Sequence, residues 1–211
     1  MIGYIKRHKI NTLKALVSAA LIGGGLFVLG SLSACSTQKI QDLTNRTPAL
    51  SLEEFFEGET IAYGIFEDYS QSLSRQFRVN ITGTVEGNVL TLEEDFLYDD
   101  GQTQRRVWVI TNLGDDAEGI TRYEGRADDV IGTASGKVAG NALHWAYMVA
   151  LPVGDSVYHI HFDDWIYQQD AHVALNRARL SKFGIEVGSV TLAFVRGPAA
   201  ELIGPLDLEN W

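Results

Sequence analysis

Histidine and carboxylate side chains alternate along one short stretch of the sequence, at His159, His161 and Asp163. In a β-strand, alternate residues face the same side, so these three side chains and Trp165 would share one face. Imidazole and carboxylate groups are ligands of Zn²⁺, but a site also needs a further ligand or a bound water. The opposite face carries apolar residues such as Ile160, which indicates a core face and leaves the histidines in solvent. We therefore predict that no metal is bound, and no motif implies another cofactor.

Three acidic doublets lie within or beside the expected strands: Glu93-Glu94, Asp128-Asp129 and Asp163-Asp164. Adjacent strand residues point to opposite faces, so each doublet can place only one acid inside. A pair of acids for acid–base catalysis must therefore come from different strands, and the sequence does not show which ones meet. The sequence contains no glycine-rich phosphate loop, nucleophile elbow or supported Ser-His-Asp order. Whether the protein is an enzyme therefore stays open.

Five arginines lie among apolar and aromatic neighbours: Arg105, Arg106, Arg126, Arg177 and Arg179. An arginine that faces the interior must be paired, because an isolated buried charge is very costly. The carboxylates available as partners are Asp95, Asp128, Asp129 and Asp164. Alternatively, the planar guanidinium could bind a ligand carboxylate or phosphate. Arg105 and Arg106 must face opposite sides of a strand, and the large neighbour Trp108 favours Arg106 as the inward one.

The candidate ligand-binding residues combine charges and aromatic rings expected to face an interior: Arg106, Trp108, Tyr123, Arg126, Asp129, Asp164 and Arg177. Further aromatic residues expected to wall the same cavity are Tyr63, Phe66, Phe77, Phe96, Trp145 and Trp165. Together they predict a protein that binds or carries a lipid-like hydrophobic ligand, with arginine holding a polar head group. Two alternatives are an enzyme acting on a lipid or hydrophobic metabolite, and an assembly partner in the cell envelope.

Short strands must position these residues. In residues 73–85, for example, Phe77, Val79 and Ile81 alternate with polar side chains, which is the pattern of a half-buried strand. Tight-turn signals such as Asp99-Asp100-Gly101 separate about eight to ten such runs, and no long amphipathic helix is expected. Closing an antiparallel meander into a barrel removes its exposed edges. We therefore predict an all-β, up-and-down antiparallel barrel, with a two-sheet sandwich as the alternative.

Residues 1–34 have the order of a secretory signal: basic residues, an apolar run over 15–29, and then small residues. The sequence Leu32-Ser33-Ala34-Cys35 resembles the lipobox of bacterial lipoproteins, whose cysteine is acylated and becomes the new N-terminus. A transmembrane helix needs about 20 apolar residues, whereas this run is short and interrupted by three glycines. Cys35 is the single cysteine, so no internal disulfide is possible. In bacterial lipoproteins, an Asp directly after the acylated cysteine resembles a signal for retention in the inner membrane. This chain has Ser36 at that position, which favours the outer membrane facing the periplasm, with the inner membrane as the alternative.

Charge and composition limit which partners the protein can bind. The chain has 211 residues and a formal net charge of −10. The signal contains four of the 17 basic residues and no acid, so the remainder has 13 basic against 27 acidic residues. Such an acidic protein is repelled by phosphate backbones, which excludes nucleic acid as a partner. The predicted organisation is a signal peptide (1–34), a lipidated tether (35–49), a barrel domain (50–196) and an acidic C-terminal tail (197–211).

Several blocks of sequence resemble one family of proteobacterial lipoproteins, the domain of unknown function 3833. They include Ala62–Phe66, Leu92–Phe96, Gln104–Trp108, Tyr123–Val130, His161–Trp165 and Ser181–Gly184. The resemblance extends over nearly all of Phe55–Arg196 and implies a lipocalin-type (calycin-like) barrel. Members of the family are found beside genes for fatty-acid-modifying enzymes, which implies a lipid-related role. The resemblance supplies no catalytic residues, and the C-terminal tail departs from the family.

Overall fold

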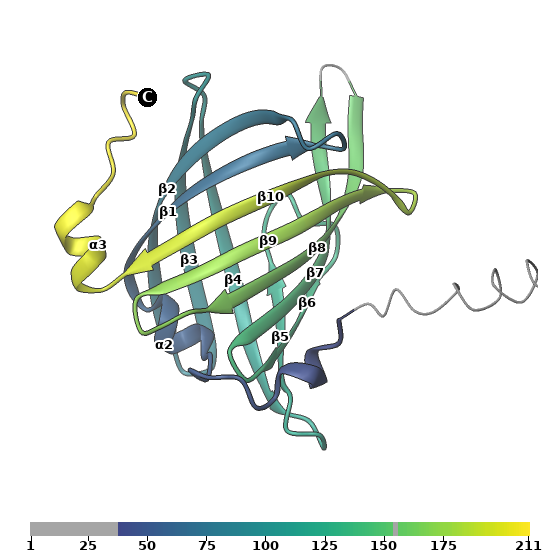
Figure 1. Cartoon of the computed structure of the whole chain (residues 1–211), viewed down its shortest axis with the longest axis vertical. Coiled ribbons are helices and arrows are strands. Elements are labelled where there is room, and N and C mark those ends of the chain that lie inside the picture. Colours follow the sequence, from purple (N-terminus) through teal and green to yellow (C-terminus); the bar gives the residue numbers. More distant parts are fainter. Residues whose placement is uncertain (1–37, 154–155) are drawn as a thin grey trace, which may run out of the picture. The chain divides into compact units, whose positions relative to one another are not determined.

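The computed structural model describes residues 38–153 and 156–211, and ten antiparallel strands in this part of the chain form one closed barrel (Figure 1). The strands are β1 (Gly58–Asp68), β2 (Leu73–Glu86), β3 (Val89–Tyr98), β4 (Thr103–Asp115), β5 (Thr121–Arg126), β6 (Ala134–Ala139), β7 (Ala142–Val153), β8 (Ser156–Gln168), β9 (Val173–Lys182) and β10 (Ile185–Arg196). Each strand pairs with its neighbours in the chain, and β10 closes the barrel on β1. The predicted up-and-down barrel is confirmed, and the two-sheet sandwich is wrong. The signal sequence and Cys35 lie outside the described residues.

The alternation expected for β2 is present in the barrel wall. Phe77, Val79 and Ile81 are buried and face the interior, whereas Asn80 faces outward and contacts the C-terminal segment. Because a strand has a side-chain period of two, one correctly assigned residue sets the orientation of the rest. The inner faces of all ten strands thus supply the wall of a common interior.

A short helix, α2 (Leu52–Phe56), closes one end of the barrel (Figure 1). Ser51 caps it, because its hydroxyl oxygen accepts a hydrogen bond from the Glu54 backbone N–H at 3.2 Å. Phe55 and Phe56 are buried against the strands. At Gly83 of β2 there is no room for a side chain, since a Cβ would overlap the carbonyl oxygen of Phe56. This close approach lets the helix seat directly on the barrel wall.

The segment before α2 packs against the barrel, although the sequence predicted a plain tether there. It contains the 3₁₀ turn η1 (Ile40–Leu43), in which Ile40 is buried against Ile120 and Ala142. Further along, the backbone N–H of Leu50 donates to the carbonyl oxygen of Gly140 at 2.8 Å. Ile40 and Leu43 belong to one apolar cluster with the barrel, and Leu50 is buried in the main core. Residues 39–49 therefore belong structurally to the barrel domain.

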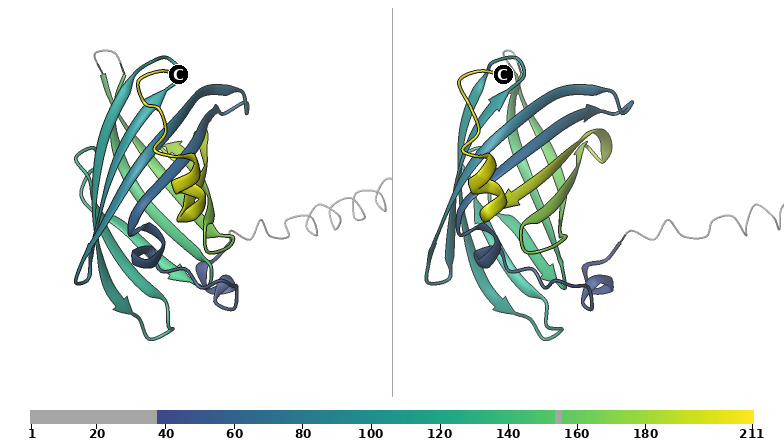
Figure 2. Two further views of the ribbon diagram at one scale, coloured as in Figure 1. Left: turned by 90° about the vertical axis from the view of Figure 1, so that its left-hand side faces the viewer. Right: turned by 60° about the vertical axis from the view of Figure 1, so that its left-hand side comes forward.

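The C-terminal segment lies against the outer wall of the barrel (Figure 2). It contains α3 (Pro198–Ile203), and its apolar residues Ala200 and Leu206 pack on Ile61. The Asn80 amide of β2 donates to the Leu206 carbonyl and accepts from the Leu206 N–H, at 2.9 and 2.8 Å. The tail is thus held by specific contacts. Among the described helices, none is long and apolar enough to cross a membrane.

Candidate ligand-binding cavity

The barrel encloses a cavity of about 220 Å³. Leu52 and Phe56 of α2 line its closed end. Leu151, near the opposite end of β7, also lines it and is 44% exposed, so the cavity reaches the surface there. Pockets for drug-sized ligands measure about 300–1,000 Å³. The cavity is therefore suited to a small molecule or a single narrow chain.

Aromatic side chains form much of the cavity wall. Those that line it are Phe56, Phe66, Phe77, Phe96, Tyr98, Trp108, Trp145, Tyr147, Phe162 and Phe194. Five of the aromatic residues predicted from the sequence are among them. Tyr63 and Trp165 are not, because their strand positions point outward: Tyr63 is 46% exposed, and Trp165 stacks on His144. Tyr123 is buried but bonds instead to Glu53 of α2, its hydroxyl donating at 2.9 Å.

Arg106 of β4 projects into this cavity. Its Nε lies 3.1 Å from Oδ1 of Asp129, and its guanidinium lies 4.5 Å from the centre of the Trp108 ring. The side chain is 16% exposed, and its Nε and Nη2 atoms are buried without a well-formed hydrogen bond to any described residue. The prediction that Arg106 faces the interior is confirmed. The guanidinium has an ion-pair partner and still has donor capacity to satisfy.

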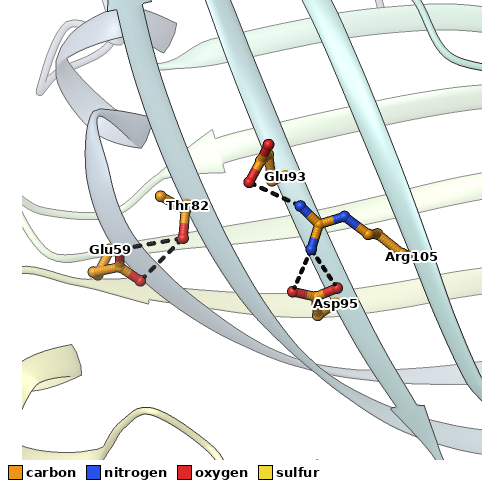
Figure 3. A network of polar contacts seen from close by, with 5 residues as sticks. All are labelled: Glu59, Thr82, Glu93, Asp95 and Arg105. Atoms are coloured by element: carbon orange, nitrogen blue, oxygen red, sulfur yellow. Dashed lines mark hydrogen bonds and ion pairs between the residues drawn. The ribbon is translucent and has the colours of Figure 1, made fainter.

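The neighbouring Arg105 faces solvent, as predicted (Figure 3). Its guanidinium bonds Glu93 at 2.9 Å and Asp95 at 3.2 Å across the outer surface of β3. The Arg105 side chain is 56% exposed, and ion pairs at this exposure contribute little to stability. The two adjacent arginines therefore have opposite surroundings on the two sides of one sheet.

Each acidic doublet places one carboxyl inside, namely Glu94, Asp129 and Asp164, all of which line the cavity. Glu94 is opposite Arg106 in the β3–β4 register. Burial raises the pKa of Glu94 to about 7, and the charge of Arg106 only partly opposes this rise. Burial also raises the pKa of Asp164 to about 6, although the Asn176 amide and the Tyr147 hydroxyl both donate to it. Five strands and a loop thus bring a polar cluster together within an apolar cavity.

Besides Tyr123, two predicted site residues do not line this cavity. Arg126 of β5 and Arg177 of β9 are exposed on the outer surface. The residues directly before them in the sequence take the inward positions of these strands. Asn176, next to Arg177, is the inward residue and is 4% exposed. The sequence interpretation did not include Glu94, Tyr147 or Asn176 in the site. The sequence does indicate that Glu94 faces inward, because it lies two residues from both Leu92 and Phe96, and alternate residues of a strand share one face.

The stretch proposed as a possible metal site faces outward. Asp163 pairs with His144 of β7, with 2.7 Å between Nε2 and Oδ1. His159 is exposed, and His161 is partly exposed. Within residues 38–153 and 156–211, no group of three or more His, Cys, Asp or Glu side chains is arranged to hold a metal ion. That no metal is bound stays a prediction.

A closed up-and-down barrel with one lined cavity defines a lipocalin-like fold. Among solved structures, it is similar to the S-type phycobiliprotein lyase CPES from Guillardia theta, with a TM-score of 0.51 and 12% sequence identity. That match covers 76% of this chain and 98% of the lyase chain, and at this identity the likeness is one of fold. The chain belongs to the family of proteins of unknown function DUF3833, whose model matches residues 29–196. A comparison with curated proteins gives no match.

Proposed function

We propose that this protein binds a small lipid-like molecule, with its apolar part in the barrel and its polar end at the Arg106 cluster. The observation that carries the proposal is the cavity, which has an aromatic wall and a buried guanidinium with unused donors. An assembly protein that used only its outer wall would not need an unfilled interior. The barrel of the phycobiliprotein lyase fits a ligand-binding use of this fold.

The mouth of the barrel supports loading from an apolar environment. The up-and-down order places the β1–β2 and β9–β10 connections, and the start of β8, at the end away from α2. Large apolar side chains at or beside these connections are exposed: Tyr69, Leu73, Val157, Phe183 and Ile185. Phe183 is 95% exposed, and a group of exposed apolar side chains, unlike a single one, is typical of a surface that contacts a ligand, a membrane or a partner. Such a rim gives a hydrophobic ligand an apolar path to the cavity.

The second part of the proposal is a lipid anchor at Cys35 that holds the barrel at the outer membrane, facing the periplasm. The inner membrane is the alternative location. The matched family region begins at residue 29 and so includes the lipobox-like sequence, which supports a shared anchor. The excess of acidic residues opposes binding to anionic lipid by charge. Acyl chains supply about 0.8 kcal/mol per buried methylene group, so two or more chains make the attachment lasting.

A matched pair of substitutions tests the cavity. Val149 lines the cavity and is buried, whereas Val109 is on the outer face and is 46% exposed. We expect Val149→Phe to weaken binding of the neutral probe N-phenyl-1-naphthylamine by about tenfold or more, since added volume occupies the site. Val109→Phe should bind it as the parent protein does. Unchanged binding by a folded Val149→Phe variant would contradict the proposal.

A second candidate function rests on Glu94. A carboxyl group with a pKa of about 7 in an apolar cavity is suited to donate and accept protons near neutral pH. This favours an enzyme that moves a proton on a hydrophobic substrate. Turnover of a bound ligand that Glu94→Gln abolishes, without loss of binding, would support this function over simple carriage.

A further inference from the structure

The charges inside the cavity define which polar head group it accepts. The only guanidinium among the described lining residues is Arg106, and three carboxyls line the same space: Glu94 from β3, Asp129 from the β5–β6 connection and Asp164 from β8. The Arg106 charge is already matched by Asp129, with 3.1 Å between the paired atoms. The remaining two carboxyls make the cluster neutral to negative, depending on their protonation. A ligand carboxylate would therefore add a like charge to a site that has no cation to spare.

The cluster has both a free hydrogen-bond donor and free hydrogen-bond acceptors. Arg106 Nη2 is a buried donor without an acceptor among the described residues. Glu94 makes no hydrogen bond to the described side chains around it, and its ionised form offers only acceptor oxygens. Asp164 is already bonded by Asn176 and Tyr147. A head group that both accepts from Arg106 and donates to Glu94 would satisfy both free groups.

A hydroxyl group has that capacity, since it carries one donor hydrogen and two acceptor lone pairs. A carboxylate only accepts, so it would leave Glu94 unsatisfied and repel it. A protonated amine only donates, so it would leave Arg106 Nη2 without an acceptor, although the excess of carboxyls would attract its charge. The uncharged hydroxyl also loses the least hydration free energy on entering an apolar cavity.

We infer that the cavity selects an uncharged, hydroxyl-bearing amphiphile, of the class of medium-chain alcohols, over the fatty acid of equal length. This inference rests on the proposed function and names its head group. It differs from the expectation from sequence that arginine would hold a ligand carboxylate or phosphate. The physical reason is that Arg106 is outnumbered by carboxyls that only the fold brings to it.

The test compares three ligands of one chain length: 1-decanol, decanoate and decylamine. Binding to the full-length protein in phosphatidylcholine nanodiscs is followed by tryptophan fluorescence, because Trp108 and Trp145 line the cavity. Empty nanodiscs give the partitioning blank. We expect decanol to bind about tenfold or more tightly than decanoate at pH 8, where the carboxyls are ionised. Decylamine should bind no more tightly than decanol, because it leaves the buried Arg106 donor without an acceptor.

A charge-removing substitution gives the second arm. Glu94→Gln keeps the shape of the side chain and removes one negative charge, so decanoate should gain about tenfold in affinity while decanol changes little. Glu93→Gln, on the outer face of the same strand, is the control and should alter neither. Tightest binding of decanoate or decylamine by the parent protein would overturn the head-group inference and leave the proposed function intact. No binding of any of the three would refute the proposed function itself.

Discussion

Replacing Glu94 with Gln should stabilise the protein at alkaline pH and have little effect at acidic pH. Burial raises the pKa of Glu94 from 4.5 to about 7. Between these values the folded protein retains a proton that the unfolded chain has lost. By linkage, the stability of the folded state falls as the pH rises through this range and stays lower above it. Glutamine has no charge to lose, so the variant does not undergo this fall.

The magnitude follows from the size of the pKa change. Each unit of pKa corresponds to about 1.4 kcal/mol, so a rise from 4.5 to about 7 corresponds to about 3 kcal/mol of lost stability above pH 7. Burial also raises the pKa of Asp164, to about 6. The folded protein therefore loses further stability as the pH rises through this lower range. That contribution is present in both proteins and largely cancels in the comparison. The free energy of unfolding should therefore differ between variant and parent by about 3 kcal/mol more at pH 8 than at pH 4.5.

Urea unfolding of the full-length protein, followed by tryptophan fluorescence at the two pH values, measures this difference. The control is Glu93→Gln, because Glu93 is on the same strand but forms an exposed ion pair with Arg105. Its effect should stay within about 1 kcal/mol at both pH values, as for other exposed pairs. An equal effect of Glu94→Gln at both pH values would show that the Glu94 carboxyl is not held in a buried environment.

Three further predictions concern the ion pair, the helix seat and the anchor. Arg106→Ala strands the cavity carboxyls and should cost about 3–5 kcal/mol at pH 8, whereas Arg105→Ala should cost about 0.5 kcal/mol or less; equal small losses in urea unfolding would refute the buried pair. Gly83→Ala puts a Cβ against the backbone of α2 and should cost about 1–3 kcal/mol, while Thr84→Ala on the exposed side should cost little. Cys35→Ser should release the protein from the membrane fraction, and unchanged fractionation and mass would contradict lipidation.

The sequence by itself determined the strand architecture, because its signals are local. Alternation of apolar and polar residues and tight-turn motifs predict the meander, and the removal of two exposed sheet edges favours closure into a barrel. The same period of two separated Arg105 from Arg106 and one acid from the other in the strand doublets Glu93-Glu94 and Asp163-Asp164. These inferences need only neighbouring residues, so they could be made without a structure.

Side-chain orientation on weakly patterned strands depended on the tertiary structure. On β9 the inward positions are Ala174, Asn176 and Ala178, while the larger Leu175 is 45% exposed. The larger apolar residue thus lies on the outer face, which is also the face of Arg177. Small side chains at these inward positions leave room for the cavity and for the aromatic side chains that other strands place around it.

The composition of the polar cluster also required the fold. Asp129 lies in a connection, and strand periodicity does not predict that it would reach Arg106 on β4. Asp164 and Tyr147 likewise meet across the β7–β8 pair. Contacts between distant segments depend on register and barrel closure, which set the number of carboxyls around the single arginine. The sequence could therefore identify Arg106 as an inward charge, but only the tertiary structure shows the three carboxyls that share its cavity.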